Sequence, residues 1–151
     1  MKLNPVILLF LIIITAFGCN NQNTEVYTNY YRAVNGSDTA DLKLSTIGNH
    51  FYGQYEIRKN WYTYRTGNIE GKIMGDTLIG DFYYKPFSGG AKKRMPFALL
   101  KRDDALHVGN GLISSYMGVP FFVPSVPITY DSAEFVLVKV EKELLDSVFT
   151  K

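Results

Sequence analysis

Hydrophobic and polar residues alternate along much of the chain, most strictly over residues 39–46. There Ala40, Leu42 and Leu44 occupy every second position, and the residues between them are polar. Because successive side chains of a β-strand point to opposite faces, this period of two predicts a half-buried strand. An aromatic run over residues 26–33 precedes it, and an Asn-Gly-Ser-Asp turn sequence separates the two segments. The pair is therefore predicted to form a hairpin.

Further segments have the β-branched and aromatic content and the flanking turn residues of strands. They cover residues 51–57, 69–73, 78–84, 97–101, 106–109 and 135–140. No stretch between them has the period of an amphipathic helix. About eight strands at short intervals predict an antiparallel meander, which we expect to close into a small lipocalin-like β-barrel. A sandwich of two sheets is the alternative all-β fold, because the pattern does not distinguish closure from stacking.

Three of these segments carry a glycine in the middle, namely Gly53, Gly71 and Gly80. When the apolar residues of each segment are placed on one face, the glycines fall on that same face. Interior glycines in strands mark sharp curvature or a close approach of two backbones, as at the corners of barrels. They therefore favour closure over an open sheet.

The pattern is different at the N-terminus, where Lys2 precedes an unbroken apolar run from Val6 to Ile14. A basic start, a short apolar region and small residues behind it are the layout of a secretory signal peptide. The stretch is shorter than the about twenty residues that a helix needs to cross a hydrocarbon core. We therefore predict that residues 1–18 are a signal peptide that is removed.

Ala16-Phe17-Gly18-Cys19 resembles the lipobox of bacterial lipoproteins. Gly18 and Cys19 match that motif, whereas Ala16 and Phe17 stand where Leu and a small residue are usual. The resemblance implies that Cys19, the only cysteine, receives a diacylglyceryl thioether and that acyl chains such as palmitate attach the protein to a membrane.

The predicted lipid anchor defines the domain plan. Residues 19–25 are expected to be a polar tether, residues 26–141 the barrel domain, and residues 142–151 a tail that is one helical turn or frayed. In some bacteria, lipoproteins sorted to the cell surface carry acidic residues directly after the cysteine, whereas here the first is Glu25. We therefore expect a location in the cell envelope, at the periplasmic face of the outer membrane.

Composition narrows the function classes. Removal of the signal peptide leaves 133 of the 151 residues, enough for one domain with its own core. The formal net charge of +2 gives no electrostatic reason for nucleic-acid binding. Eleven Tyr and ten Phe supply large side chains for the core of a protein that has no second cysteine for a disulfide. We expect a monomer that does not bind nucleic acid.

No set of residues in the sequence predicts catalysis or a metal site. His50 and His107 lie far apart in sequence and have no cysteine as a co-ligand. Asp103 and Asp104 are adjacent, which is typical of a turn rather than of an acid and base pair. The segment 109–111 lacks the third glycine of a dinucleotide site. We therefore expect no enzyme activity, no cofactor and no metal.

Candidate ligand-binding residues come from the inward positions of the predicted strands and from an aromatic connection over residues 60–65. They are Phe51, Tyr55, Trp61, Tyr62, Tyr64, Ile73 and Phe82. Aromatic residues at a barrel mouth either stack on a ligand or plug the end. One hypothesis is therefore a module that holds a small apolar ligand or a lipid. The other is a structural or stress-related envelope lipoprotein with a filled barrel and no ligand.

Two segments stand outside the strand pattern. Residues 112–128 are strongly apolar, but Pro120, Pro124 and Pro127 exclude a regular helix or a central strand. We expect this segment to cap the core, and the alternatives are a contact with the bilayer or a lid over a cavity. The basic run Lys92-Lys93-Arg94 either contacts lipid headgroups or another anion, or is a solvated loop.

From Tyr30 to Gly111 the order of motifs resembles a group of small bacterial lipoproteins of uncharacterised activity. The motifs are Y-Y-x-A-x-x-G-x-D-T, E-G-K-I-M-G-D-T-L-I-G-D-F, K-R-M-P-F-A-L-L-K and G-N-G. Residues 71–82 are the most specific part. The resemblance implies a lipid-anchored β domain and supplies no catalytic residues.

Overall fold

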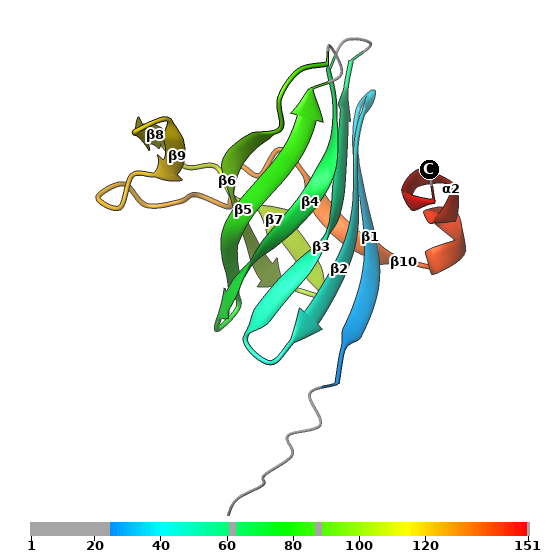
Figure 1. Cartoon of the computed structure of the whole chain (residues 1–151). Helices are drawn as coiled ribbons and strands as arrows, with labels where there is room; N and C mark the ends of the chain where they lie inside the picture. The colour runs from blue at the N-terminus through cyan, green and yellow to red at the C-terminus, as the bar shows by residue number, and fades with distance from the viewer. Residues whose placement is uncertain (1–24, 61–62, 87–88, 151) are drawn as a thin grey trace, which may run out of the picture.

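The computed structural model describes residues 25–60, 63–86 and 89–150. Eight strands form one closed antiparallel barrel (Figure 1). They are β1 (Tyr27–Asn35), β2 (Asp38–Ile47), β3 (His50–Lys59), β4 (Thr63–Met74), β5 (Thr77–Pro86), β6 (Lys93–Arg102), β7 (Ala105–Val108) and β10 (Val136–Val140). The predicted signal peptide, Cys19, Trp61 and Tyr62 lie outside the described residues.

Each strand from β1 to β6 pairs with the next strand of the chain, and β10 pairs with both β7 and β1. The last pairing closes the sheet, with Tyr30 opposite Val140 and Arg32 opposite Val138. The predicted all-β meander and its closure into a small, lipocalin-like barrel are thereby confirmed, in preference to the sandwich.

The glycines in the strands explain how the sheet bends. Gly71 and Gly80 face each other across β4 and β5. A Cβ atom on Gly80 would lie 2.0 Å from the carbonyl oxygen of Glu70, and one on Gly53 would lie 2.0 Å from that of Lys43. Since no side chain fits such a gap, glycine is what allows the neighbouring strands to coil this tightly. The curvature predicted at these glycines is confirmed.

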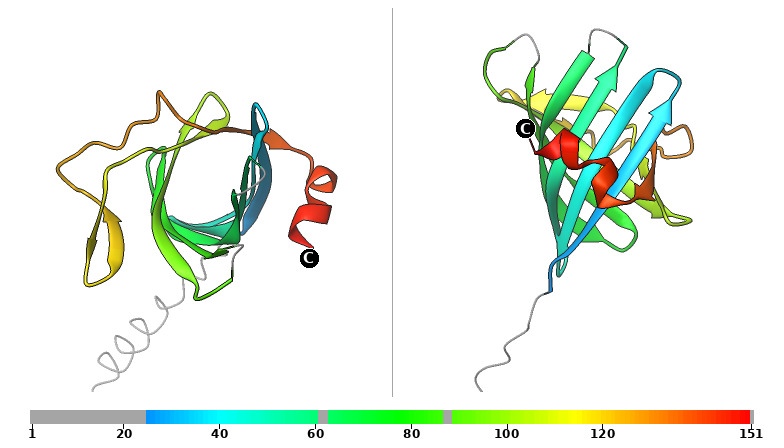
Figure 2. Two further views of the ribbon diagram at one scale, coloured as in Figure 1. Left: turned by 90° about the horizontal axis from the view of Figure 1, so that it is seen from above. Right: turned by 90° about the vertical axis from the view of Figure 1, so that its right-hand side faces the viewer.

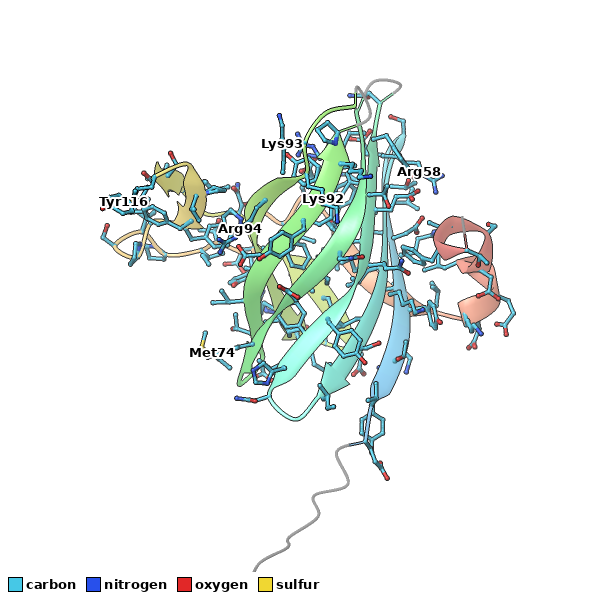
Figure 3. The ribbon with its side chains drawn as sticks, viewed as in Figure 1. Arg58, Met74, Lys92, Lys93, Arg94 and Tyr116 are labelled. Carbon is cyan, nitrogen blue, oxygen red and sulfur yellow. The ribbon has the colours of Figure 1, made fainter. Side chains whose placement is uncertain are left out.

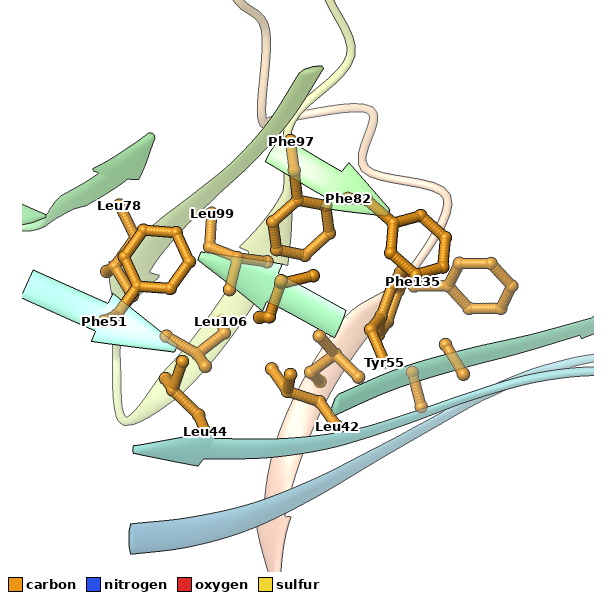
Figure 4. Packing of buried hydrophobic residues seen from close by; sticks show 14 residues of the cluster. Leu42, Leu44, Phe51, Tyr55, Leu78, Phe82, Phe97, Leu99, Leu106 and Phe135 are labelled. Atoms are coloured by element: carbon orange, nitrogen blue, oxygen red, sulfur yellow. The ribbon is translucent and has the colours of Figure 1, made fainter. Parts of the chain in front are cut away.

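The middle of the barrel is filled. The large buried side chains include Leu42, Phe51, Tyr55, Ile69, Phe82, Leu99 and Leu137 (Figure 4). The ring of Tyr55 packs edge-on against Phe82, with centroids 5.3 Å apart, and lies 5.0 Å from the ring of Phe97. This packing divides the interior into two ends with a closed centre between them.

Two elements lie outside the barrel, on opposite sides of it (Figure 2). The first is a separate hairpin of β8 (Ile113–Tyr116) and β9 (Val119–Phe122), of which β9 contacts β6. The second is a C-terminal segment with the 3₁₀ helix η2 (Lys142–Leu144) and the short helix α2 (Asp146–Phe149), which crosses the outside of β1 and β2.

The hairpin corrects the expectation that residues 112–128 cap the core. The segment projects away from the barrel, and Tyr116 and Met117 are 73% and 85% exposed. Its strands pair with each other, with Ser115 opposite Pro120, so the proline lies in a strand of a two-stranded sheet and not in a central one.

Candidate ligand cavity

One end of the barrel contains a cavity of about 150 Å³, at the end where β3 finishes and β6 begins. Its apolar wall consists of Ile57, Phe82, Met95, Phe97, Val108 and Phe135. Four side chains with polar groups also line it, namely Tyr55, Lys59, Arg65 and Glu134. An apolar pocket with a few convergent polar groups is the usual form of a small-molecule site.

Tyr55 provides the most informative group in this cavity. Its side chain is 1% exposed, and its hydroxyl has no hydrogen-bond partner among the described residues. Burial raises the pKa of the hydroxyl, and the negative charge of Glu134 raises it further. The group therefore stays protonated and is available as a donor. A buried hydroxyl without a partner costs about 1–3 kcal/mol, so a molecule that accepts this hydrogen bond gains from the site.

The charges around the cavity are unequal. Lys59 forms an ion pair with Glu134, and its ammonium lies 5.7 Å from the ring centroid of Phe135. Arg65 lies over the ring of Tyr84, at 5.3 Å from the centroid, and no carboxylate pairs with it among the described residues. Two cations and one anion therefore leave a positive charge at the cavity, which favours a ligand with one negative group.

A second cavity of about 310 Å³ lies at the other end of the barrel. It is lined by Asn29, Tyr31, Leu44, Thr46, Ile73, Gly75, Asp76, Leu78, Lys101 and Leu106. Burial raises the pKa of Tyr31, and the negative charge of Asp104 adds to the effect.

The residues predicted to line a single ligand cavity are thus divided. Tyr55 and Phe82 line the first cavity and Ile73 the second, while Phe51 belongs to the buried core cluster and lines neither.

Tyr64 does not lie with these residues. It was expected in the connection between two strands, but it belongs to β4, opposite Arg58. Its hydroxyl donates a 2.8 Å hydrogen bond to Glu56, whose side chain points to the outside of the barrel. Tyr64 is therefore part of the outer wall. Trp61 and Tyr62 lie outside the described residues.

Two carboxylates are buried on the outer surface of the barrel, a feature that the sequence pattern did not predict. Asp41 and Glu56 are opposite each other on β2 and β3 and are almost fully buried. Arg32 binds Asp41 through two nitrogens, at 2.6 and 3.0 Å, and Arg58 donates to Glu56 at 2.7 Å. Because each carboxylate has an arginine partner, this cluster stabilises the wall rather than offering a reactive group.

The described part of the chain contains no group of three or more His, Cys, Asp and Glu side chains that could hold a metal ion. Within the same residues, no helix has the length and apolar content needed to span a bilayer.

Comparisons with known proteins return no match. No protein-family model fits the chain, and neither the curated proteins nor the solved structures give a significant similarity.

Proposed function

We propose that the protein is an envelope lipoprotein whose barrel binds a small amphipathic anion. Acyl chains on Cys19 attach it to the periplasmic face of the outer membrane, and the barrel serves as a binding module rather than an enzyme. The lipobox-like sequence at Cys19 and the polar tether behind it support the attachment. The cavity that contains Tyr55 supports the binding role.

The observation that carries the binding role is the unpartnered hydroxyl of Tyr55, buried in a wall of apolar side chains. Nothing in the packing of the core requires a hydroxyl at this position, since phenylalanine fills the same space. A ligand that accepts a hydrogen bond from this hydroxyl would explain why the position carries tyrosine.

Cavity volume and charge define the class of ligand. A cavity of about 150 Å³ is large enough for a benzene-sized body. Arg65 supplies a cation for an attached carboxylate, while the aromatic and aliphatic wall holds the body. We therefore propose an aromatic or branched aliphatic carboxylate as the ligand class.

A structural role with a filled barrel is the second candidate. It is favoured by the packed core of the barrel, in which Phe51, Leu42 and Leu99 are among the fully buried side chains. The two candidates predict different results for a small probe, because only the binding role requires the end cavity to accept one.

Titration with benzoate, followed by amide NMR shifts, tests the binding role. We expect shifts at residues around the Tyr55 cavity and weaker binding of benzyl alcohol, which lacks the charge. Tyr55→Phe is expected to weaken benzoate binding several-fold, while the ligand-free protein becomes at least as stable as the wild type because the unpartnered hydroxyl is gone. Arg65→Gln is expected to remove the preference for benzoate over benzyl alcohol. Tyr31→Phe, in the opposite cavity, is the matched control and should bind as the wild type does.

Two results would contradict the binding role. One is benzoate shifts that do not involve the Tyr55 cavity, and the other is unchanged binding by Tyr55→Phe. Either result favours the filled structural barrel.

The attachment is tested separately by the intact mass of the protein extracted from native membranes. The expected mature chain begins at Cys19 and carries acyl mass, and a Cys19→Ala variant is expected to leave the membrane fraction. A soluble, unacylated wild type would refute the anchor without affecting the cavity test.

A further inference from the structure

The hairpin outside the barrel, with the residues on both sides of it, is the largest feature that the proposed function leaves unused. We refer to residues 109–130 as the apolar arm. This stretch contains no Asp, Glu, Lys, Arg or His. Uncharged runs of this length on a protein surface are typical of contact with another apolar phase or partner.

The exposed side of the arm is apolar. The pairing of β8 with β9 places Tyr116 beside Val119 and Ser114 beside Phe121, so these four share one face of the hairpin. Its large exposed hydrophobic side chains are Leu112, Ile113, Tyr116, Met117, Val119, Phe121 and Val126. A hairpin in water usually presents polar side chains on its solvent face, which makes this face unusual.

The arm is held at its base, so its exposure is a property of a defined structure. Asn110 and Thr129 exchange backbone hydrogen bonds of 2.9 and 2.8 Å, and Gly109 donates one of 2.8 Å to Ala98 on β6. The ring of Phe122 lies so close to Gly111 that a Cβ atom there would be 2.7 Å from it. The apolar side chains at the other end are therefore presented from a fixed platform.

The tip of the arm combines backbone strain with apolar exposure. Met117 and Gly118 both have positive φ values, +49° and +79°. A two-residue turn of this kind favours Asn-Gly, and the left-handed conformation is unfavourable for most other residues. The chain nevertheless places a methionine here, 85% exposed. Turn stability does not explain the residue, whereas contact with an apolar phase does.

Basic residues lie beside the arm. Lys92 and Lys93 are exposed where β6 begins, and β6 is the strand that β9 contacts. Figure 3 shows Lys93 and Arg94 on the side of the barrel towards Tyr116. Arg94 is bound to Asp81 through two 2.8 Å hydrogen bonds, but the two lysines have no carboxylate partner among the described residues. These free cations complement a negatively charged surface.

We propose that the apolar arm is a second membrane contact, which inserts its tip into the interface of a bilayer containing anionic phospholipid. Met117 and Tyr116 enter the region between headgroups and acyl chains, where amphipathic aromatic rings are favoured. Lys92 and Lys93 contact the headgroups, whose negative charge attracts basic residues. The inference rests on the proposed anchor at Cys19. Since acyl chains already supply the affinity, the arm fixes the orientation of the barrel on the membrane.

The experiment uses the lipidated full-length protein with Met117→Cys, reconstituted in vesicles of phosphatidylethanolamine and phosphatidylglycerol. The diacylglyceryl thioether blocks the sulfur of Cys19, so a nitroxide label attaches only at position 117. Collisions of the label with oxygen, which partitions into the bilayer, are compared with collisions with a water-soluble nickel complex. The control is the same label on Val34→Cys, at an exposed position next to the β1–β2 turn.

We expect the label at position 117 to be shielded from nickel several-fold relative to the label at position 34. In vesicles with phosphatidylglycerol, a Lys92→Gln, Lys93→Gln variant is expected to lose part of this shielding. In vesicles of phosphatidylcholine alone, the variant and the protein with both lysines are expected to be shielded equally. Equal nickel access at both positions would overturn the inference. Shielding that arises only when envelope proteins are added would also overturn it, in favour of a protein partner.

Failure of the anchor has a different signature. If Cys19 is not acylated, the intact mass shows it and Cys19 itself takes the label. The arm is then tested by sedimentation of the unacylated protein with the same anionic vesicles. Binding by the wild type and its loss in Met117→Ser would support the arm, and equal binding by both would refute it.

Discussion

The C-terminal segment and the apolar arm lie on opposite sides of the barrel, and they differ in what their apolar side chains contact (Figure 2). Both are short appendages of the barrel: the arm lies between β7 and β10, and the C-terminal segment follows β10. Leu145, in the C-terminal segment, is fully buried, whereas Tyr116 and Met117 of the arm are largely exposed. An apolar side chain of an appendage is therefore buried on one side of the barrel and exposed on the other.

The barrel wall differs correspondingly on the two sides. On the side of β1 and β2, which the C-terminal segment crosses, the wall has buried charges: Asp41 and Glu56 are almost fully buried, and each is paired with a partly exposed arginine. Beside the arm, the wall ends in the exposed lysines at the start of β6. The first side is built for stability, and the second is accessible to a partner outside the chain.

The largest expected effect is a difference in the free energy of unfolding between one substitution in the C-terminal segment and one in the arm. Leu145→Ala removes a fully buried side chain and is expected to cost about 3 kcal/mol in the free energy of unfolding. Tyr116→Ala removes a larger side chain from an exposed site and is expected to change it by less than about 0.5 kcal/mol. Urea denaturation measures both. Similar losses in the two variants would mean that the arm, too, is part of the core.

A smaller difference is expected between two arginine and aspartate pairs of the same geometry. In each pair the arginine binds the carboxylate through two nitrogens, Arg32 to the buried Asp41 and the exposed Arg94 to the half-buried Asp81. Arg32→Gln leaves a buried charge with a weaker partner and is expected to cost about 2 kcal/mol, because Arg32 itself is partly exposed.

Arg94→Gln is the matched variant on the side of the arm and is expected to cost under about 1 kcal/mol, because solvent screens the pair. Thermal or urea unfolding of both variants at low and high salt provides the measurement. Only the cost of Arg94→Gln should shrink as salt is added, and equal salt dependence would contradict the difference in burial.

The fold was predictable because alternation and turn residues are local signals, which each segment of the sequence carries by itself. The strict pattern around Leu42 and the inward glycines Gly53, Gly71 and Gly80 identified both the strands and their inner face. The first half of β4 was missed, since Thr66 and Asn68 point outward and Gly67 points inward, so no apolar residue marks the alternation there.

The candidate site was only partly predictable. The inward position of Tyr55 follows from alternation, but its neighbours Arg65 and Glu134 come from segments that carried no strand signal. Their meeting depends on the register of β3 with β4 and on the path into β10. Likewise, alternation marks Asp41 as a solvent position, whereas the structure buries it and pairs it with Arg32 from the neighbouring strand. Such tertiary features have no local sequence signal.

The smallest expected effect has the opposite sign and concerns the tip of the arm. Met117→Asn replaces a residue at φ +49° with one that tolerates the left-handed region and favours this two-residue turn. We expect the free energy of unfolding to rise by about 0.5 kcal/mol. It is measured by urea denaturation of the protein in detergent, without a bilayer.

The matched variant Val34→Asn, at another exposed apolar position next to a hairpin turn, should give no gain, because Val34 lies in β1 without a positive φ and asparagine is disfavoured in strands. A gain at position 117 together with weaker binding to anionic vesicles would mean that the natural residue sacrifices turn stability for contact with the membrane. A loss of stability would instead show that Met117 supports the arm itself, and the contrast with the buried C-terminal segment would then be one of degree. The sign of this small change in stability therefore distinguishes a methionine that serves membrane contact from one that stabilises the arm.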